Sequence, residues 1–383
     1  MTRVVIVGVG ETEYVRRSDK SIKTLVLQAV CRALDDCSID ASEVDGIVSE
    51  AGIMPYVMPA DEVAANLGIS RSFTAQASVG GAGTVASMQL AADAISSGWT
   101  HVVVCYFGVD WGSSDGGPYE FHTRDRYKDS LEFPIGWYGQ PAYISPILRR
   151  YQHEYGLRSE QLGALAIATR SHALMNPAAQ ERRPFTLSDY LASPMIADPL
   201  RLFDCCLRTD GAAAFVMTSE ERARGCPTHP IYIAGVGFAA SALSASSYLT
   251  QNPDYLSTPA KDSAPRALAR AGLSLSDVQF AEIYDCFTIS CLIQMEDIGF
   301  CRRGEAGEFV EGGRTGPGGE FPVNTHGGLL SHAYMLGINH VVEAVRQLRH
   351  EAGPRQVPGA EVGLVAGWGG WEHATAILTR NRL

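Results

Sequence analysis

The chain has 383 residues, a length that favours two domains or one large α/β unit, each able to bury a substantial core. Hydrophobic residues make up 46% and charged residues 19%, proportions typical of a folded protein and not of a disordered one. The formal net charge of −11, without any tract rich in lysine or arginine, argues against binding to nucleic acid or to an anionic membrane.

The N-terminal residues 2–8 predict a buried strand that enters a turn. They lack the basic-then-apolar layout and the cleavage site of a signal peptide. No apolar stretch is long enough to span a bilayer, because Asp93 interrupts the best candidate. We therefore expect a cytoplasmic protein without a membrane partner.

Nine cysteines are scattered along the chain and form no C-x-x-C pair: Cys31, Cys37, Cys105, Cys205, Cys206, Cys226, Cys286, Cys291 and Cys301. In a cytosolic chain this pattern argues against a zinc ribbon and favours free buried thiols over disulfides. The adjacent Cys205 and Cys206 have poor geometry for a shared metal ion, so we interpret both as inert thiols. We predict no metal site.

The chain repeats its own pattern. An apolar run that ends in Gly-Val-Gly at residues 4–10 returns at residues 231–237. Each copy is followed by a helical stretch and then by a capped turn that leads into a buried strand, at residues 39–48 and again at residues 273–280.

The correspondence continues beyond these turns. In the first half, the glycine-rich residues 80–83 open a helix through Ile95, and a strand follows at residues 101–105. In the second half, residues 327–328 open a helix, and a strand follows at residues 362–365. Two copies indicate a duplicated domain and not a solenoid. The alternation of strands and helices predicts two packed β/α halves whose sheets are covered by helices.

Residues 108–205 fit neither copy and include a helical pattern over residues 151–178. We interpret them as an insertion that covers one face of the core, where lids and substrate channels are commonly built. The predicted segments are an N-terminal half of residues 1–107 with 206–225, an inserted loop domain of residues 108–205, and a C-terminal half of residues 226–383.

Three segments together resemble the thiolase superfamily, and within it the sterol-carrier-protein-type thiolases. Residues 204–214 resemble the segment that closes the first half of these enzymes, residues 282–287 (EIYDCF) resemble their ELHDCF motif, and residues 324–331 (NTHGGLLS) resemble their NPxGGLIS segment. The resemblance covers nearly the whole chain. It implies an α/β thiolase fold, in which two duplicated β/α halves form a layered α-β-α-β-α core with an inserted loop domain.

The departures from the family pattern fall on its reactive residues. Alignment by the helix end at residues 95–98 places Gly81 where a thiolase carries its nucleophilic cysteine, at a helix N-terminus that favours the thiolate. Tyr334 stands at the histidine of the Gly-His-Pro motif, and Tyr284 replaces the histidine of ELHDCF. Residues 366–370 contain no second reactive cysteine. The chain therefore lacks the family's thiol chemistry and gains two tyrosines that we expect to face one pocket.

Two tyrosines suit the retro-aldol cleavage of a β-hydroxyacyl-CoA, which needs no acyl-enzyme. One group removes the β-hydroxyl proton, the Cα–Cβ bond breaks, and a second group stabilises or protonates the thioester enolate. We assign Tyr284 and Tyr334 as the catalytic pair without deciding which is the base, because a tyrosine pKa of ~10 makes either a slow base at neutral pH. His326 and His332 flank this region and are further catalytic candidates.

Five residues around the pair are candidates for binding the thioester: Gly81, Asp285, Asn324, Gly327 and Gly328. Replacement of the cysteine by Gly81 is expected to open space beside the reacting carbon, which would suit an acyl chain with a steroid or another bulky ring. Asp285 either orients Tyr284 or caps the end of a strand. For the glycines, tight packing of a helix on the sheet is an equally good explanation.

The resemblance extends to the lipid-transfer-protein-type aldolases of steroid side-chain breakdown, which are cysteine-less thiolase homologues that work with an OB-fold partner bearing a zinc ribbon. It implies such a partner here, a CoA-thioester substrate and no cofactor bound by this chain. It also implies a homodimer, in which residues 101–105 would pair across the two-fold axis.

Two other functions stay open. The first is acyl transfer or thiolysis, in which CoA attacks directly or Cys286 serves as a displaced nucleophile; acylation of a cysteine by substrate would support it. The second is a non-catalytic thiolase-fold subunit that binds acyl-CoA or scaffolds a partner. Phenylalanine variants of Tyr284 and Tyr334 that keep full biological activity would support that function.

Overall fold

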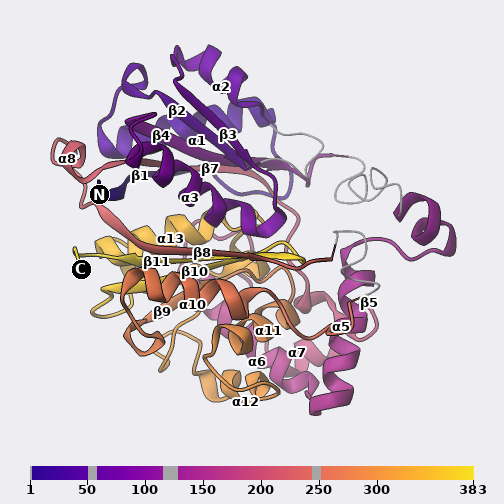
Figure 1. The fold of residues 1–383 in the computed structure, drawn as a ribbon. Helices are drawn as coiled ribbons and strands as arrows, with labels where there is room; N and C mark the ends of the chain where they lie inside the picture. Colours follow the sequence, from indigo (N-terminus) through magenta and orange to yellow (C-terminus); the bar gives the residue numbers. More distant parts are fainter. Residues whose placement is uncertain (1, 51–57, 115–127, 244–251) are drawn as a thin grey trace.

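The computed structural model describes residues 2–50, 58–114, 128–243 and 252–383 and shows an α/β protein built on one large sheet (Figure 1). The strands of this sheet are β1 Val4–Glu11, β2 Gly46–Glu50, β3 Phe73–Ala77, β4 Val102–Asp110, β7 Asp210–Ser219, β8 Ile231–Ala240, β9 Phe280–Ile283, β10 Val362–Trp368 and β11 Glu372–Thr379. A separate two-stranded ribbon consists of β5 Met195–Ala197 and β6 Leu200–Arg201.

The α-helices of the described segments differ in length from one turn to more than four turns. They are α1 Ile22–Cys37, α2 Ala60–Leu67, α3 Gly83–Ser96, α5 Gln140–Tyr155, α6 Ser159–Leu174, α7 Leu187–Ala192, α8 Glu220–Ala223, α10 Ala260–Ala271, α11 Thr288–Ile298, α12 Ala306–Val310 and α13 Ile338–Arg349. Across the described segments, no helix is both long and apolar enough to cross a membrane.

The strand order is β3-β2-β4-β7-β1-β8-β11-β10-β9. The first five strands come from the first half of the repeat and its closing segment, and the last four come from the second half. A short antiparallel pairing of β1 with β8, at Val5 with Tyr232 and Ile6 with Ile231, connects the two sets. The duplication predicted from the sequence is therefore visible as two sets of strands joined at their inner members.

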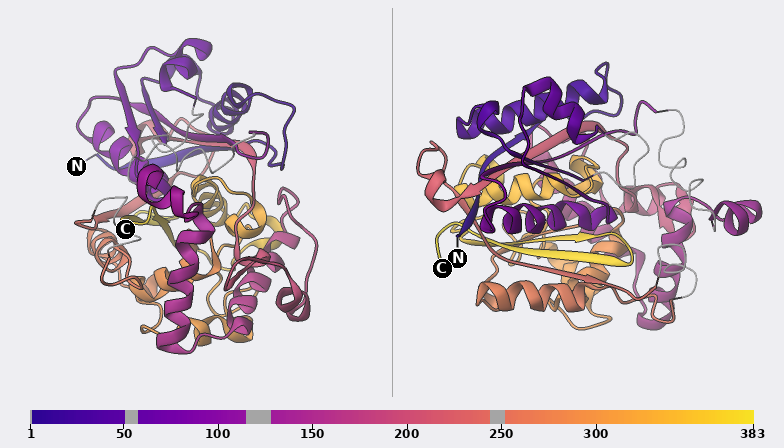
Figure 2. Two further views of the ribbon diagram at one scale, coloured as in Figure 1. Left: turned by 90° about the vertical axis from the view of Figure 1, so that its right-hand side faces the viewer. Right: turned by 45° about the horizontal axis from the view of Figure 1, so that its top comes forward.

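Helices and strands alternate in five layers (Figures 1 and 2). Helix α1 packs on the outer face of β1, β4 and β7, and α3 and α13 lie between the two sets of strands. Helices α10 and α11 cover β8, β11 and β9 from the opposite side. The predicted layered α-β-α-β-α core is confirmed, because each apolar sheet face is buried against a helical layer.

The Gly-x-Gly pattern at the start of each half has the same physical cause in both. A Cβ atom at Gly8 or Gly10 in β1 would lie 2.1 or 2.3 Å from backbone atoms of Ala33 in α1. A Cβ atom at Gly235 in β8 would lie 2.2 Å from the carbonyl oxygen of Ala267 in α10. The helix in each half rests directly on the strand backbone, so the repeated motif reflects helix–strand packing.

Two expected helices differ from the structure. Gly327 and Gly328 have φ of 107° and 56°, which an ordinary helix does not allow, so only a single π-type turn, Gly328–His332, forms here. Helix α13 begins after Gly337, whose φ is 89°. The helical pattern over residues 151–178 is divided between α5 and α6, because Gly156 in the left-handed conformation ends α5.

The prediction that residues 101–105 form the dimer interface is wrong. Residues 101–105 lie largely in β4, which is hydrogen-bonded to β2 on one side and to β7 on the other. A strand with two neighbours in its own sheet has no free edge to offer a second subunit. Among the described strands, the free edge of this half is β3, which pairs with β2 alone.

Between β4 and β7 the chain leaves the layered core and forms α5, α6, α7 and the β5–β6 ribbon (Figure 2). Helix α6 packs against α7, α11 and α12, so this region lies beside the second half of the molecule. We keep the division into two halves and an inserted domain, with the boundaries given above, as a proposal.

Candidate active site

Tyr284 and Tyr334 face each other although they lie 50 residues apart in the chain. Tyr284 directly follows β9, and Tyr334 follows the π-type turn that precedes α13. Their hydroxyl oxygens are 2.8 Å apart and share a hydrogen bond in which either can be the donor. Both side chains are buried, with 4% and 6% of their surface exposed. The structure thus brings the two predicted catalytic residues into direct contact.

The environment of the pair keeps both hydroxyl groups protonated at rest. Burial raises the pKa of Tyr284 and of Tyr334 well above 10.0. The shared hydrogen bond has a smaller and opposite effect on the two: it raises the pKa of Tyr284 further and lowers that of Tyr334. Both hydroxyls are therefore neutral in the resting site, and either can donate the shared hydrogen bond.

Both halves of the molecule hold the pair in place. Gln294 of α11 donates a hydrogen bond to the backbone carbonyl of Tyr284 (2.7 Å). The backbone N–H of Tyr334 donates to the hydroxyl of Thr209 (2.9 Å). The ring of Trp111, just beyond β4, stacks on Tyr334 with the centroids 4.5 Å apart and the planes at 17°. The site therefore lies where first-half and second-half residues meet.

Gly81 lies in the short 3₁₀ turn Gly80–Ala82, which leads into α3. A Cβ atom on Gly81 would lie 2.3 Å from the carbonyl oxygen of Trp368 and 2.4 Å from Cζ of Tyr284. The ring of Tyr284 thus occupies the space that a side chain at this position would need. The expectation that Gly81 opens space for the substrate is wrong, because Tyr284 fills that space.

Two thiols lie close to the tyrosine pair but are poor nucleophiles. The backbone N–H of Cys206 donates to the carbonyl of Cys286 (3.0 Å). Burial raises the pKa of Cys286 to about 12 and that of Cys206 well above 9.0. Both are protonated at neutral pH, which disfavours Cys286 as a displaced nucleophile. Burial also raises the pKa of Cys205 to about 12. All nine cysteines are unpaired, as predicted, although Cys31 is exposed.

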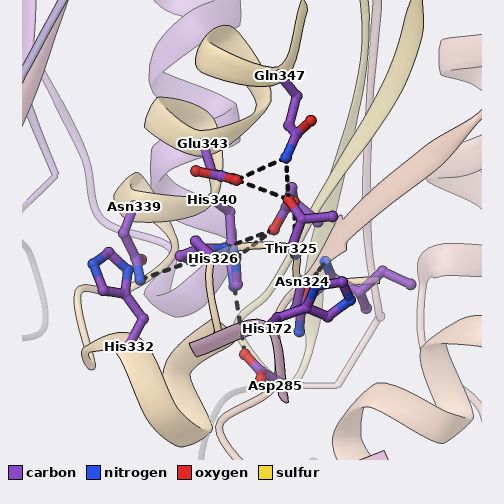
Figure 3. Close-up of polar contacts among 12 residues, drawn as sticks. His172, Asp285, Asn324, Thr325, His326, His332, Asn339, His340, Glu343 and Gln347 are labelled. Carbon is purple, nitrogen blue, oxygen red and sulfur yellow. Dashed lines mark hydrogen bonds and ion pairs between the residues drawn. The ribbon is translucent and has the colours of Figure 1, made fainter. Parts of the chain in front are cut away.

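A buried polar cluster adjoins Tyr284 in the chain and connects β9, residues 324–332 and α13 (Figure 3). Oε2 of Glu282 lies 2.9 Å from Nδ1 of His326 and 3.6 Å from Nδ1 of His340. Oε1 of Glu282 accepts hydrogen bonds from the backbone N–H and the hydroxyl of Thr325. These contacts fix the second-half motif segments relative to one another.

The charges of this cluster balance. Burial acts to raise the pKa of Glu282, but the neighbouring His326 and His340 together outweigh it and lower that pKa to about 2. Burial acts to lower the pKa of His326, but Glu282 and the nearby carboxylates of Glu343 and Asp285 together outweigh it and raise that pKa above 6.5. Arg355 lowers the pKa of Glu343 against the effect of burial and pairs with it at 2.9 Å. Two carboxylates thus face two cations, as buried charges require.

Donor atoms of Glu282, His326 and His340 also lie within 4.8 Å of one another, close enough for a metal ion. The amino-acid sequence did not reveal this arrangement, because the spacing of the three residues matches no metal-binding motif. The ion pair between Glu282 and His326 gives the cluster a structural role without a cation. The absence of a metal site stays our proposal.

His332 lies beside this cluster, with Nε2 3.7 Å from Oε1 of Glu11. Burial lowers its pKa well below 6.5, and neither ring nitrogen has a hydrogen-bond partner in the described part of the chain. Its ring packs edge-on against Tyr14 and His326. Over the same residues, no hydrogen bond connects His326 or His332 to the tyrosine pair. In the described residues, the two predicted histidines are therefore not part of the hydrogen bonding of the tyrosine pair.

The other predicted residues build the turn next to the pair. Asp285 accepts a hydrogen bond from the backbone N–H of Leu329 (2.7 Å), and a Cβ atom at Gly328 would lie 2.0 Å from Oδ2 of Asp285. The side-chain amide of Asn324 accepts a hydrogen bond from the backbone N–H of Ile283 (2.7 Å) and donates one to the backbone carbonyl of Ile283 (2.9 Å). Asp285 thus anchors the turn that begins at Gly327, and its hydrogen bond is to that turn and not to the hydroxyl of Tyr284.

Three neighbours of the site were not predicted from the sequence: Trp111, Thr209 and His340. Thr209 lies within residues 204–214, whose resemblance to the family was a usable signal. Trp111 and His340 gave no such signal, because their contacts with Tyr334 and Glu282 arise only when distant segments pack together.

Comparison with known proteins places this geometry in a family context. Residues 241–380 match the family model described as thiolase C-terminal domain-like. The chain is 36% identical to a 17-hydroxy-3-oxo-4-pregnene-20-carboxyl-CoA lyase of Mycobacterium tuberculosis, over 91% of this chain and 92% of that protein. It is 37% identical to a steroid side-chain-cleaving aldolase of Thermomonospora curvata, over 90% of each chain.

Solved structures give the same result. The structure of an Ltp2-ChsH2(DUF35) aldolase superposes with a TM-score of 0.91 at 33% identity, over 98% of this chain and 97% of that one. A monomeric SCP2-thiolase-like protein of Mycobacterium smegmatis superposes with a TM-score of 0.76 at 20% identity, over 100% of this chain and 78% of that one, and so shares the fold.

Proposed function

This chain belongs to the thiolase superfamily and to its carbon–carbon lyases, and we therefore propose that it cleaves a β-hydroxyacyl-CoA by a retro-aldol reaction. The products are a ketone and a shorter acyl-CoA. The acyl chain that we propose carries a tertiary hydroxyl on a ring carbon, as in a steroid side chain. The relatives named as a steroid-carboxyl-CoA lyase and a steroid side-chain-cleaving aldolase support this substrate class.

One observation carries the proposal. The ring of Tyr284 occupies the space beside Gly81, and its hydroxyl lies 2.8 Å from that of Tyr334. A hydrogen-bonded pair of phenols thus stands where the family resemblance places a nucleophilic cysteine. Such a pair can move protons but cannot form a thioester with the substrate.

The reaction follows from this pair. In the minor form of the site in which Tyr334 has lost its proton to solvent, the Tyr334 phenolate takes the β-hydroxyl proton while Tyr284 donates a hydrogen bond to it. The Cα–Cβ electron pair moves to Cα and forms the thioester enolate, and the β-carbon becomes the ketone carbonyl. Protonation of Cα then releases the shorter acyl-CoA. We propose that the chain needs no bound cofactor, because the substrate thioester itself stabilises the enolate.

The assembly is also part of the proposal. We propose a homodimer formed through the free edge of β3, in place of residues 101–105. We also propose an OB-fold partner subunit of the DUF35 type, and the superposed aldolase supports it, because that aldolase is named with a DUF35 component. The net charge of −11 supports a partner other than nucleic acid.

Acyl transfer remains the second candidate, and one experiment separates it from cleavage. The protein is incubated with a β-hydroxyacyl-CoA that carries a tertiary ring hydroxyl, without free CoA, both alone and with a co-encoded DUF35 protein. The products are identified by mass spectrometry. A ketone and a shorter acyl-CoA are the expected result. Cleavage only after addition of free CoA, or a cysteine that gains an acyl mass, would instead establish thiolysis.

A further inference from the structure

Glu50, the last residue of β2, carries a buried carboxyl group that has no partner among the residues that the structure describes. Its side chain is 2% exposed, and neither carboxyl oxygen has a hydrogen-bond partner among the described residues. Proteins seldom bury a carboxyl group in this way, because it loses the hydrogen bonds of water and gains none in return. Within the described residues, no hydrogen bond therefore accounts for the burial of the Glu50 carboxyl group.

The side chains of Glu50 and Tyr284 both lie against the residues that lead into α3. A Cβ atom on Gly83, the first residue of α3, would lie 2.2 Å from Oε1 and 2.6 Å from Cδ of Glu50. Gly81, two positions earlier, gives room to the ring of Tyr284 in the same manner. Two glycines at the start of one helix thus each admit a side chain that can carry a proton.

The charge state of Glu50 suits a proton donor. Burial raises the pKa of Glu50 well above 4.5, so the carboxyl group keeps its proton far more readily than an exposed glutamate. Tyr334 is close enough that a charge on Glu50 adds to the effect of burial and thiols on its pKa. The donor and the proposed base therefore influence each other directly.

We propose that Glu50 is the acid that protonates Cα of the thioester enolate. The inference rests on the proposed retro-aldol cleavage and supplies its last step. The O–H bond of Glu50 breaks, a C–H bond forms at Cα, and the carboxylate is left. The proton that Tyr334 removed from the β-hydroxyl then passes to Glu50, so that both groups regain their starting state without a further reactant.

The test uses the reverse of that step, in which the Glu50 carboxylate would remove the α-proton of an acyl-CoA. Propionyl-CoA is incubated with the full chain in D₂O, with and without the DUF35 protein, and deuterium at Cα is followed by mass spectrometry. Glu50→Gln is expected to slow this exchange by about 100-fold or more. Cleavage of the β-hydroxyacyl-CoA should slow together with it, and Glu50→Asp should restore part of both.

Two further variants keep the outcome clear. Gly83→Ala places a methyl group where the Glu50 carboxyl lies and should slow the exchange although Glu50 is intact. Glu62→Gln, an exposed glutamate of α2 that pairs with Lys23, is the matched control and should exchange at the wild-type rate. Thermal unfolding of each variant verifies that it folds.

The outcomes separate the two proposals. Exchange by Glu50→Gln within twofold of wild type would overturn the role of Glu50 and leave the cleavage reaction standing. Exchange by the wild type without cleavage of any β-hydroxyacyl-CoA would overturn the proposed function while still testing Glu50. A wild-type chain that does neither would overturn both.

Discussion

The two tyrosines act as a unit in the proposed reaction, so each hydroxyl should be needed. Tyr334→Phe removes the proposed base and Tyr284→Phe removes the donor that stabilises it. We expect each variant to reduce kcat for carbon–carbon cleavage by about 10²–10⁴-fold. The kcat of the double variant should be similar to that of the less active single variant. Single-turnover kinetics with the β-hydroxyacyl-CoA measure this. Full activity in both single variants would assign the chain to the non-catalytic function.

A substitution at Gly81 tests the packing of the site without changing either tyrosine hydroxyl. Gly81→Ala should reduce cleavage, because the new methyl group would lie 2.3 Å from a backbone oxygen and 2.4 Å from the ring of Tyr284. Overpacking of this kind costs about 1–3 kcal/mol. Urea denaturation and kinetics measure the two effects. Gly136→Ala is the control for the stability measurement. No atom lies near its Cβ position, so it reports the cost of an alanine at a positive φ of 79° without any steric clash. Unchanged stability and activity of Gly81→Ala would contradict the geometry.

Among the elements of the fold, β9 is connected to the segment before α13 by the ion pair of Glu282 and His326. Removal of His326 leaves Glu282 buried and unpaired, so His326→Leu should lose about 3–5 kcal/mol of the free energy of unfolding. Glu282→Gln combined with His326→Leu should lose less than the sum of the single variants. Urea denaturation of the four proteins gives this coupling.

The same pair predicts a pH dependence with a defined sign. The pKa of Glu282 is lowered from 4.5 to about 2, so its contribution is complete above pH 4.5 and disappears as the pH falls toward 2. The pKa of His326 is raised above 6.5, so its contribution is complete below pH 6.5 and disappears as the pH rises through the raised value. The stability difference between wild type and His326→Leu should therefore be largest between pH 4.5 and 6.5. A difference that is constant from pH 3 to 9 would contradict the ion pair.

For the molecule as a whole, β3 provides the edge through which a second copy can add. The backbone N–H of Phe73 donates to Asp45 within the chain, so the alternating Thr74 directs its N–H outward. Thr74→Pro removes that donor and should convert a dimer to a monomer, whereas Thr74→Val should remain dimeric. Sedimentation velocity distinguishes the two. A dimer that survives Thr74→Pro would place the interface elsewhere.

The duplicated layered core, the family and the identity of the two tyrosines could all be predicted from the amino-acid sequence. They depend on patterns within short segments: glycines where a helix rests on a strand, apolar runs, and motif residues at 282–287 and 324–331. The same patterns placed Gly81 at the position of the missing cysteine.

Only the tertiary structure shows which of these segments contact one another. The contact of Tyr284 with Tyr334, the filling of the space at Gly81 and the burial of Glu50 beside Gly83 all join residues far apart in the chain. The interior position of β4 and the ion pair of the histidine cluster likewise depend on which segments become neighbours. Local patterns determine the conformation of a segment, but packing between distant segments determines which side chains are in contact and how far burial and neighbouring charges shift their pKa values.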